Sequence, residues 1–215
     1  MIRWLFLILA LTASPAFANH PGEHLDEVMA DKEPYFEVTN TGKVPEIELF
    51  NQNQGRFNLS DLDDQILILS FVPRDCGAAC AEQQTLLASS QARLNISPMR
   101  EMVTFITVHS EDFSETPSWD LVNWRPVMPS SDLSAVTVAD KFAKLSQRDG
   151  SAPMIHIIDR NTRHAGIFHG TSFNQMNLIL YVNGLTNAVH PPKPPVEKGW
   201  LDQLTDWFSK VGKEP

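Results

Sequence analysis

A pair of cysteines, Cys76 and Cys80, lies between a short apolar run and a helix-forming stretch, and these are the only thiols in the 215-residue chain. The run 66–72 is short and rich in isoleucine and leucine, which is typical of a buried strand. The stretch 81–94 contains few helix breakers and is predicted to be a helix. A spacing of four residues places both sulfurs on one face of the first helical turn. The fold must therefore contain a strand that leads directly into a helix with two thiols at its start.

The chemistry of this turn favours reactive cysteines. Backbone N–H groups and the helix dipole stabilise a thiolate at a helix N-terminus and lower its pKa. Two such sulfurs can bind a soft metal such as Cu(I), or can cycle between dithiol and disulfide. The alternative is a structural disulfide or two inert thiols. A disulfide between Cys76 and Cys80 closes a very small loop and constrains the unfolded chain little, so it is a weak structural cross-link.

The first 18 residues are predicted to be a signal peptide. A short basic start is followed by an apolar segment, 4–11, that is too short to span a bilayer. Ala16 and Ala18 are small residues at the two positions that a signal peptidase reads, and cleavage is expected after Ala18; the alternative is an uncleaved N-terminal anchor. The mature protein is therefore expected in the periplasm of a diderm bacterium. In that oxidising compartment the cysteine pair forms a disulfide unless a reductant or a metal prevents it.

Charge and composition divide the rest of the chain. The formal net charge is −9 and no basic patch is present, which argues against a nucleic-acid partner. Residues 19–43 are polar and are expected to form an N-terminal tail or a loosely packed arm. Residues 44–189 have the length and the apolar runs of one domain. A proline-rich linker is predicted at 190–199, followed by an amphipathic helix at 200–215.

The domain is expected to be an α/β, thioredoxin-like fold, with a mixed central sheet flanked by helices and an N-terminal β-hairpin extension. Alternating apolar residues predict the hairpin at 47–59. Strands that alternate with helices predict parallel neighbours joined by right-handed crossovers. Further strands are expected at 66–72, 103–108, 154–158 and 165–168. Helices are expected to begin at the cysteines, at Thr116 and Pro117, at Ser130 to Asp132, and at Thr171 or Ser172. The third of these helices has its apolar positions at Leu133, Val136, Phe142 and Leu145. The last is expected to end near Gly184.

The stretch from Pro45 to Cys80 contains a strand, a Gly-Arg turn, a Leu-x-Asp-Leu step, an apolar strand that ends in phenylalanine, and a C-x-x-x-C pair. In this order the motifs resemble the Sco/SenC family, the thioredoxin-fold copper chaperones of cytochrome oxidase assembly. The segment 108–117 is similar to a degraded form of the family's loop after the next strand. The resemblance covers residues 44–188. The motifs are Ile47 to Phe50, Gly55-Arg56, Leu59 to Leu62, Ile66 to Phe71, and Cys76 to Cys80.

The chain departs from the family pattern at three places. The family usually has a proline after each cysteine, where this chain has Gly77 and Ala81. The family's copper-binding histidine is absent, because counting eight residues back from Asp159 in the terminal hairpin turn leads to Ser151. Pro153 opens the following strand and resembles the cis-proline of thioredoxin, which lies beside the redox cysteines. The chain thus combines the cysteine spacing of the copper chaperones with a loop typical of thiol oxidoreductases.

His109 is the candidate for a third copper ligand. It ends the strand that follows the cysteine helix, and the carboxyl ends of parallel strands meet at one edge of a sheet, where sites form. His156 lies inside a core strand and is expected to be a buried packing histidine. The other histidines considered are expected to have ordinary surface roles (His164 and His169), or at most to bind Cu(II) weakly in the N-terminal arm (His20 and His24).

The resemblance implies a periplasmic Sco-like protein that supports copper-site maturation of a respiratory oxidase by Cu(I) binding, by thiol reduction, or by both. Cys76 is expected to attack or dock first, and Cys80 to resolve the disulfide or complete the metal pair. Pro153 is the third expected catalytic-site residue, and Cys76, Cys80 and His109 are the expected copper ligands. The expected partners are a copper-enzyme client or its copper chaperone, and a thiol–disulfide partner. Two alternatives stay open: a metal-independent thiol–disulfide oxidoreductase, and a non-catalytic binding protein with a structural disulfide.

The predicted C-terminal helix carries one large apolar stripe, and such a stripe must be covered. Docking on its own domain, a protein partner and peripheral contact with a membrane are the possible outcomes. Asp202 and Asp206 oppose contact with anionic lipid, and the stiff proline linker favours a target outside the domain. The stripe residues expected to make this contact are Trp200, Leu204, Trp207 and Phe208.

Overall fold

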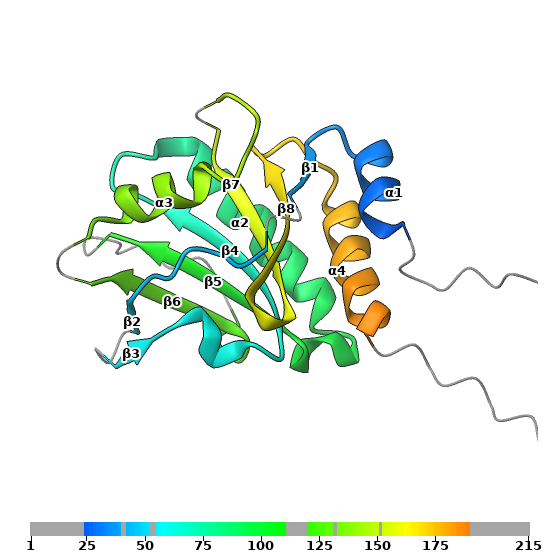
Figure 1. The fold of residues 1–215 in the computed structure, drawn as a ribbon, viewed down its shortest axis with the longest axis horizontal. Helices are drawn as coiled ribbons and strands as arrows, with labels where there is room; N and C mark the ends of the chain where they lie inside the picture. The colour runs from blue at the N-terminus through cyan, green and yellow to red at the C-terminus, as the bar shows by residue number, and fades with distance from the viewer. Residues whose placement is uncertain are drawn as a thin grey trace, which may run out of the picture.

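The computed structural model describes residues 24–39, 42–51, 55–110, 120–130, 133–150 and 152–189. The strands in these residues form one mixed sheet in the order β1-β8-β7-β4-β5-β6-β2-β3 (Figure 1). The strands are β1 (Phe36–Val38), β2 (Leu49–Asn51), β3 (Arg56–Phe57), β4 (Ile66–Val72), β5 (Val103–His109), β6 (Trp124–Pro129), β7 (Met154–Asp159) and β8 (Arg163–His169). The helices are α1 (Leu25–Lys32), α2 (Gly77–Leu94), α3 (Ala135–Ala143) and α4 (Gln175–Val189).

The central strands β4, β5 and β6 are parallel, and the flanking pairs are antiparallel. The expected α/β fold is therefore confirmed, together with its N-terminal hairpin, in which β2 pairs with β3. Val72 lies opposite His109 at the carboxyl ends of β4 and β5. Because α2 begins shortly after this end of β4, the cysteines lie at the carboxyl edge of the parallel strands.

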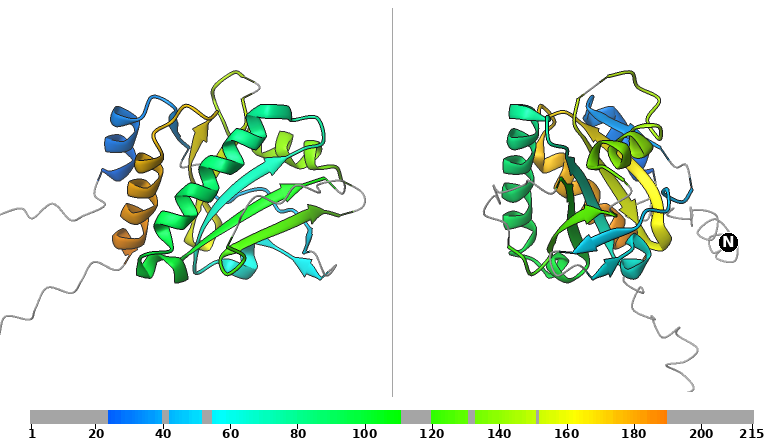
Figure 2. Two further views of the ribbon diagram at one scale, coloured as in Figure 1. Left: turned by 180° about the vertical axis from the view of Figure 1, so that it is seen from behind. Right: turned by 90° about the vertical axis from the view of Figure 1, so that its left-hand side faces the viewer.

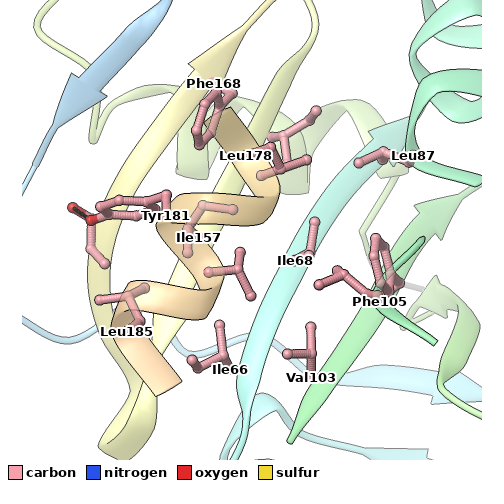
Figure 3. Close-up of a cluster of buried hydrophobic side chains, with 14 of the residues drawn as sticks. Ile66, Ile68, Leu87, Val103, Phe105, Ile157, Phe168, Leu178, Tyr181 and Leu185 are labelled. Carbon is pink, nitrogen blue, oxygen red and sulfur yellow. Dashed lines mark hydrogen bonds between the residues drawn. The ribbon is translucent and has the colours of Figure 1, made fainter. Parts of the chain in front are cut away.

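The side chains of β4 alternate between two apolar cores. Ile66 and Ile68 belong to the core formed with α2 and α4 (Figure 3). Leu67 and Leu69 belong to the core formed with α3. Figure 2 shows α2 and α4 on one face of the sheet and α3 on the other. Burial on both faces explains why 66–72 is almost continuously apolar rather than alternating with polar residues.

Residues 24–39 belong to the packed domain. Helix α1 lies against α4, and β1 pairs with β8 at the edge of the sheet. Two glycines make room for these elements: a Cβ atom on Gly166 would lie 2.5 Å from the ring of Phe36, and one on Gly184 would lie 2.5 Å from Leu25. The expectation of a tail or loosely packed arm is therefore wrong for residues 24–39, because Phe36 is only 1% exposed in the core beneath α4.

The segment before α3 differs from its prediction. The helix expected from Thr116 and Pro117 would begin outside the described residues, and residues 124–129 form the strand β6. Pro126 lies inside this strand, opposite Thr107 of β5. Proline cannot donate to a strand ladder and is disfavoured inside a sheet, so the sequence pattern did not indicate a strand here.

The helices α3 and α4 are confirmed, but both begin later than expected. Ser134, rather than Ser130 to Asp132, caps α3, and its hydroxyl accepts a backbone N–H of the first turn. Val136 is exposed, although it was expected among the apolar positions of this helix. Helix α4 begins at Gln175, three residues after Ser172, and continues to Val189.

Several expectations concern residues outside the described ranges. These are the signal peptide at 1–18, Ser151, the proline-rich linker at 190–199 and the amphipathic helix at 200–215. Among the residues that the structure describes, no helix is both long enough and apolar enough to cross a bilayer.

Candidate functional site

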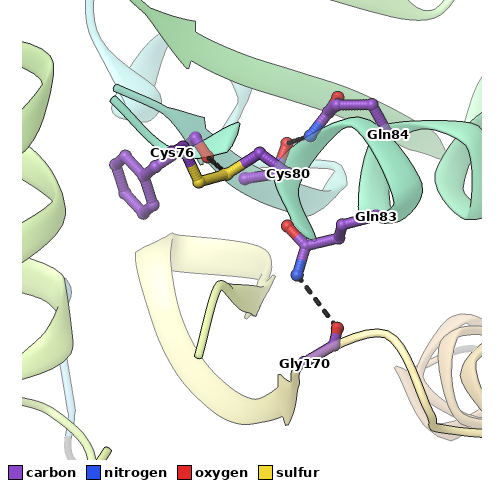
Figure 4. Close-up of a disulfide and its surroundings, with 7 residues drawn as sticks. Cys76, Cys80, Gln83, Gln84 and Gly170 are labelled. Atoms are coloured by element: carbon purple, nitrogen blue, oxygen red, sulfur yellow. Dashed lines mark hydrogen bonds between the residues drawn. A yellow bond between two sulfur atoms is a disulfide. The ribbon is translucent and has the colours of Figure 1, made fainter. Parts of the chain in front are cut away.

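Cys76 and Cys80 form a disulfide across the first turn of α2 (Figure 4). Cys76 is the N-cap residue, Cys80 lies within the helix, and their Cα atoms are 5.7 Å apart. The structure thus brings together the two sulfurs at the helix start, as the spacing predicts. Cys76 is partly exposed, whereas only 2% of Cys80 is exposed. A sulfur atom of another molecule can therefore approach Cys76 more readily than Cys80.

Gly77 explains one departure from the Sco/SenC motif. Its φ is +66°, in the left-handed region. Proline is locked near a φ of −65° and cannot adopt this conformation. Apart from the adjacent residues and the backbone of its own helix, no atom would lie within 4 Å of a Cβ atom on Gly77, so the backbone conformation, not lack of space, restricts this position. The backbone conformation at position 77 therefore favours glycine and excludes the proline that the Sco/SenC motif usually has there.

A buried polar network fixes the start of α2 on the sheet. The side chain of Gln84 donates to the Ser70 hydroxyl of β4 at 3.1 Å and accepts from the Thr107 hydroxyl of β5 at 3.1 Å. The indole N–H of Trp124 in β6 donates to the same Thr107 hydroxyl at 3.0 Å. Buried networks in which each group is satisfied are rigid. The network therefore holds the helical turn that carries Cys80 against three parallel strands.

Gln83 lies on the turn that follows Cys80, and its amide donates to the carbonyl oxygen of Gly170 at 3.2 Å (Figure 4). Its Oε1 atom is buried without a hydrogen-bond partner, and it is the sole such side-chain atom among the described residues. Leaving a buried acceptor unsatisfied costs about 1–3 kcal/mol. This residue therefore links α2 to the end of β8 at a cost in stability.

A cavity of about 250 Å³ lies beside the disulfide. Phe71, both cysteines and Pro153 line it together with His156, and Asp140 of α3 is also in its wall. Pro153 thus lies beside the cysteines, as predicted. The prediction of a cis-proline is wrong, because the described residues contain no cis peptide bond and Ala152–Pro153 is trans, the form that peptide bonds prefer.

Comparison with known proteins identifies the fold. No protein-family model matches the chain, and no curated protein matches it in sequence. BsSco, a member of the Sco family of cytochrome c oxidase assembly proteins, is 12% identical and superposes with a TM-score of 0.55 over 70% of this chain and 96% of that chain. A SCO1/SenC family lipoprotein from Bacillus anthracis is 15% identical, with a TM-score of 0.52 over 70% of this chain and 98% of that one. The chain has the thioredoxin-like fold of Sco proteins.

A Sco1 protein from Thermus thermophilus, solved in its apo form, is 18% identical, with a TM-score of 0.50 over 70% of this chain and 96% of that chain. The resemblance to the Sco/SenC family is thus confirmed at the level of the fold. In this Sco-like chain the disulfide and the cavity lie where β4 passes into α2, at the carboxyl edge of the parallel strands. Open α/β sheets place their sites at this edge.

His109 does not line the cavity beside the cysteines. It ends β5, is 7% exposed, and its Nδ1 lies 2.9 Å from the carbonyl oxygen of Ser110. Among the described residues no group of three or more histidine, cysteine, aspartate or glutamate side chains is arranged to hold a metal ion. The described structure therefore does not assemble the expected set of Cys76, Cys80 and His109, and Ser151 lies outside the described residues.

His156 is the histidine beside the cysteines in this Sco-like chain. It lies in β7, is 1% exposed, and its ring packs edge-on against Phe71 and Phe142. Its Nδ1 lies 3.0 Å from Nε2 of His164 in β8. Burial, with smaller contributions from neighbouring histidines, lowers the pKa of His156 well below 6.5. The expected packing role is confirmed, and the side chain also lies in the wall of the cavity.

His164 and His169 are both buried, so the expectation of surface roles is wrong for both. Burial lowers the pKa of His164 to about 4. His164 is fully buried because β1 covers β8, and its Nδ1 lies 2.8 Å from the Thr39 hydroxyl. The hairpin pairing of β7 with β8 could have revealed the pair, since it places His164 near His156 across the turn. The burial of His164 by β1 could not be predicted from the sequence, because the segment that forms β1 was expected to be part of a loosely packed arm.

Glu37 of β1 hydrogen-bonds to the segment that leads from α3 to Pro153 and holds it in place. Its carboxylate accepts from the backbone N–H of Gln147 and the Ser146 hydroxyl, both at 2.6 Å. It also lies 2.8 Å from Nε2 of His169. Burial alone would raise the pKa of Glu37, but these three hydrogen bonds outweigh burial and lower it below 4.5. The edge strand therefore helps to position one wall of the cavity.

Proposed function

We propose that this chain is a Sco-like thiol–disulfide exchange protein that acts in copper-site maturation of a respiratory oxidase. The observation that carries the proposal is the Cys76–Cys80 disulfide, which has one partly exposed and one buried sulfur and lies beside a cavity. Redox pairs typically show this asymmetry at a helix start. The Sco fold supports the choice of client, because the Sco protein BsSco belongs to a family of cytochrome c oxidase assembly proteins.

The exchange uses the two sulfurs in sequence. In the reduced protein, the Cys76 thiolate attacks one sulfur of a client disulfide, forms a mixed disulfide and releases the second client sulfur as a thiolate. The Cys80 thiol then loses its proton and attacks the Cys76 sulfur, which re-forms the Cys76–Cys80 disulfide and releases the first client sulfur. The client gains two electrons and the protein loses two. A dithiol reductant restores the reduced protein.

A second candidate function is Cu(I) transfer, which the Sco fold favours. Two reduced cysteines supply soft thiolate ligands that suit Cu(I) as cargo. The described residues place no third ligand with them. We infer that a Cu(I) complex of Cys76 and Cys80 needs a further ligand from solvent, from the partner or from a part of the chain beyond the described residues.

Parallel measurement of both reactions separates the two functions. Reduced protein is mixed with a disulfide-bonded peptide, with and without a strong Cu(I) chelator, and the released peptide thiols are followed over time. The exchange proposal predicts equal rates in both samples and the loss of two protein thiols per peptide disulfide. Titration of the reduced protein with Cu(I) in the absence of peptide tests the second function, with Cys80→Ser as the control. The leading proposal would be overturned if exchange occurred only without the chelator. It would also be overturned if the protein showed no exchange but bound Cu(I) tightly in a one-to-one complex.

We further propose that residues 1–18 export the protein to the periplasm and that Trp200, Leu204, Trp207 and Phe208 contact a protein client or the membrane surface. The apolar spacing of these four residues supports the second part. Deletion of 200–215 tests it. Loss of membrane co-fractionation with an unchanged melting temperature is the expected result. A lower melting temperature with unchanged co-fractionation would show that the segment belongs to the fold.

A further inference from the structure

We propose that His156, His164 and Thr39 form a proton relay that takes the proton from the Cys80 thiol when Cys80 attacks the mixed disulfide. The inference rests on the exchange function proposed above. The three side chains form a continuous hydrogen-bonded series, from a wall of the cysteine cavity to a partly exposed threonine. No other series of this kind leaves the cavity among the described residues.

Phe71 contacts both the reacting sulfur and the first member of the relay. Its carbonyl oxygen lies 3.5 Å from Sγ of Cys80, and its ring centroid lies 5.7 Å from that of His156. Cys80 and His156 also share the wall of the same cavity. In the described structure the Cys80 sulfur has its hydrogen bond with the Phe71 carbonyl oxygen, so the relay takes the thiol proton through water in the cavity that Cys80 and His156 share.

The hydrogen bonds leave one imidazole nitrogen for the cavity. Nδ1 of His156 faces Nε2 of His164, so Nε2 of His156 is the atom without an assigned partner. The Thr39 hydroxyl donates to the carbonyl oxygen of His164 at 3.4 Å, and its oxygen can then accept Nδ1–H of the same histidine. In that arrangement His164 Nε2 accepts Nδ1–H of His156, and His156 Nε2 carries a free lone pair. This lone pair is the base.

The pair of histidines resolves a difficulty of a buried base. Burial strongly disfavours a charged imidazole at His156 and at His164. In a relay neither ring needs to hold a charge for long. His156 Nε2 accepts the thiol proton, Nδ1–H of His156 passes to His164 Nε2, and Nδ1–H of His164 passes to the Thr39 oxygen. The threonine hydroxyl proton leaves to solvent, so one proton exits and both rings end neutral.

The relay acts only on the second half of the exchange. Cys80 is buried, and its neutral thiol must become a thiolate before it can attack Cys76. The new Cys76–Cys80 bond then forms as the bond between Cys76 and the client sulfur breaks, and the client leaves as a thiolate. The first attack by Cys76 needs no relay, because Cys76 is partly exposed at the helix N-terminus. Only the resolving step should therefore depend on His156.

Asp140 is the competing base, since it also lines the cavity and lies on α3. Asp140 is exposed, whereas His156 is buried and continues into the hydrogen-bonded series that leads away from the cavity. Glu37 binds both His169 and the segment before Pro153. Burial disfavours the cation of His164 most, while Glu37 favours this cation and Arg163 disfavours it. Burial of both rings therefore favours a relay in which each histidine stays neutral.

Rapid mixing of the reduced full-length protein with an aromatic disulfide tests the relay. Attack by Cys76 releases the first coloured thiolate, and resolution by Cys80 releases the second, so the two steps are timed separately. For His156→Gln we expect an unchanged first step and a second step slowed roughly 100-fold, the scale of general-base catalysis. Thr39→Val should slow the second step less, and should lower the solvent deuterium isotope effect measured for the wild type. His24→Gln, at an exposed histidine that hydrogen-bonds to Glu27, is the matched control.

The outcomes are distinct. If the rate of the second step is the same in the wild type, His156→Gln and Thr39→Val, and their melting temperatures are unchanged, the relay is overturned and the exchange function stays intact. A second step that is slowed by Asp140→Asn but not by His156→Gln would assign the base to Asp140. Absence of both steps in the wild type would overturn the exchange function together with the relay. If His156→Gln does not fold, Thr39→Val carries the test, because Thr39 lies at the partly exposed end of the series.

Discussion

The ring of Phe36 packs directly over Gly166, so closely that a Cβ atom on the glycine would lie 2.5 Å from the ring. This contact joins β1 to β8 at the edge of the sheet. The same edge strand carries Glu37 and ends beside Thr39, so the contact also supports the loop before Pro153 and the cover over His164. The N-terminal segment is therefore linked to the redox site through the sheet.

Substitution of Gly166 tests this link. We expect Gly166→Ala to lower the free energy of unfolding by about 1–3 kcal/mol, because the added methyl group overpacks the contact with Phe36. Urea unfolding of Gly166→Ala, Phe36→Leu and the double variant measures the effect. The smaller leucine should relieve part of the clash, giving a coupling energy of about 0.5 kcal/mol or more. Strictly additive effects would contradict the contact.

Gly77 is expected to be intolerant of side chains despite its open surroundings. Gly77→Ala should cost about 1–2 kcal/mol of stability, because its φ of +66° is strained for any residue with a Cβ atom. Gly77→Pro should cost more, since the ring forces a different φ. Thermal melting of both variants, beside Ala78→Ser at the exposed next position, is the measurement. A Gly77→Pro variant as stable as the wild type would show that the helix start rearranges to the family's usual motif.

Reduction of the disulfide is expected to leave the domain folded. The loop closed by Cys76 and Cys80 is short, and the chain-entropy model gives such a loop a stabilisation of about 2 kcal/mol. Denaturant unfolding with and without reductant should therefore show a small difference, with Cys76→Ser/Cys80→Ser as the control that reductant does not affect. Unfolding of the wild type on reduction would favour the alternative of a structural disulfide.

The buried histidines should make the protein sensitive to mild acid. His164 has a pKa of about 4 in the folded state, against about 6.5 when unfolded. The unfolded state therefore binds more protons between these values, and stability falls as the pH falls from 6.5 to 4. The loss from His164 is on the order of 3 kcal/mol, and His156 acts in the same direction.

Unfolding free energies measured from pH 7 to pH 4.5 check this expectation, and His164→Gln should flatten the pH dependence. Glu37 acts in a lower window, because its folded pKa lies below 4.5 and its stabilising effect is lost only as the pH falls below that value. An unchanged slope in His164→Gln would contradict the assignment of the acid-sensitive group.

The sequence predicted the elements whose apolar pattern is strong. The strand 66–72, the cysteine helix and the terminal hairpin were all expected, and the register of β4 with β5 brings their carboxyl ends together as the parallel prediction requires. Strand β6 was missed because Pro126 interrupts its pattern. The short β1 was missed because three residues in a polar context carry too little signal, and its position depends on tertiary contact with β8.

The candidate site could be predicted only in part, because some of its residues are marked by a sequence pattern and others are brought there by tertiary contacts. The cysteine pair follows from local order along the chain, whereas the location of Pro153 beside it follows from the resemblance of this loop to that of thioredoxin. The choice between His109 and His156 follows from neither, since it depends on which face of each strand points toward α3. His156 packs against Phe71 of β4 and Phe142 of α3, whereas His109 ends its strand with a hydrogen bond to the Ser110 carbonyl oxygen.

Trapping of the mixed disulfide tests the central claim most directly. Reduced Cys80→Ser is incubated with a disulfide-bonded peptide, and intact-mass and fragment spectra locate any adduct, with reduced Cys76→Ser as the comparison. We predict a stable peptide adduct on Cys76 in Cys80→Ser, slower adduct formation in Cys76→Ser because Cys80 is buried, and no lasting adduct in the wild type. Absence of any adduct in Cys80→Ser, or faster reaction of Cys80 than of Cys76, would contradict exchange through this pair.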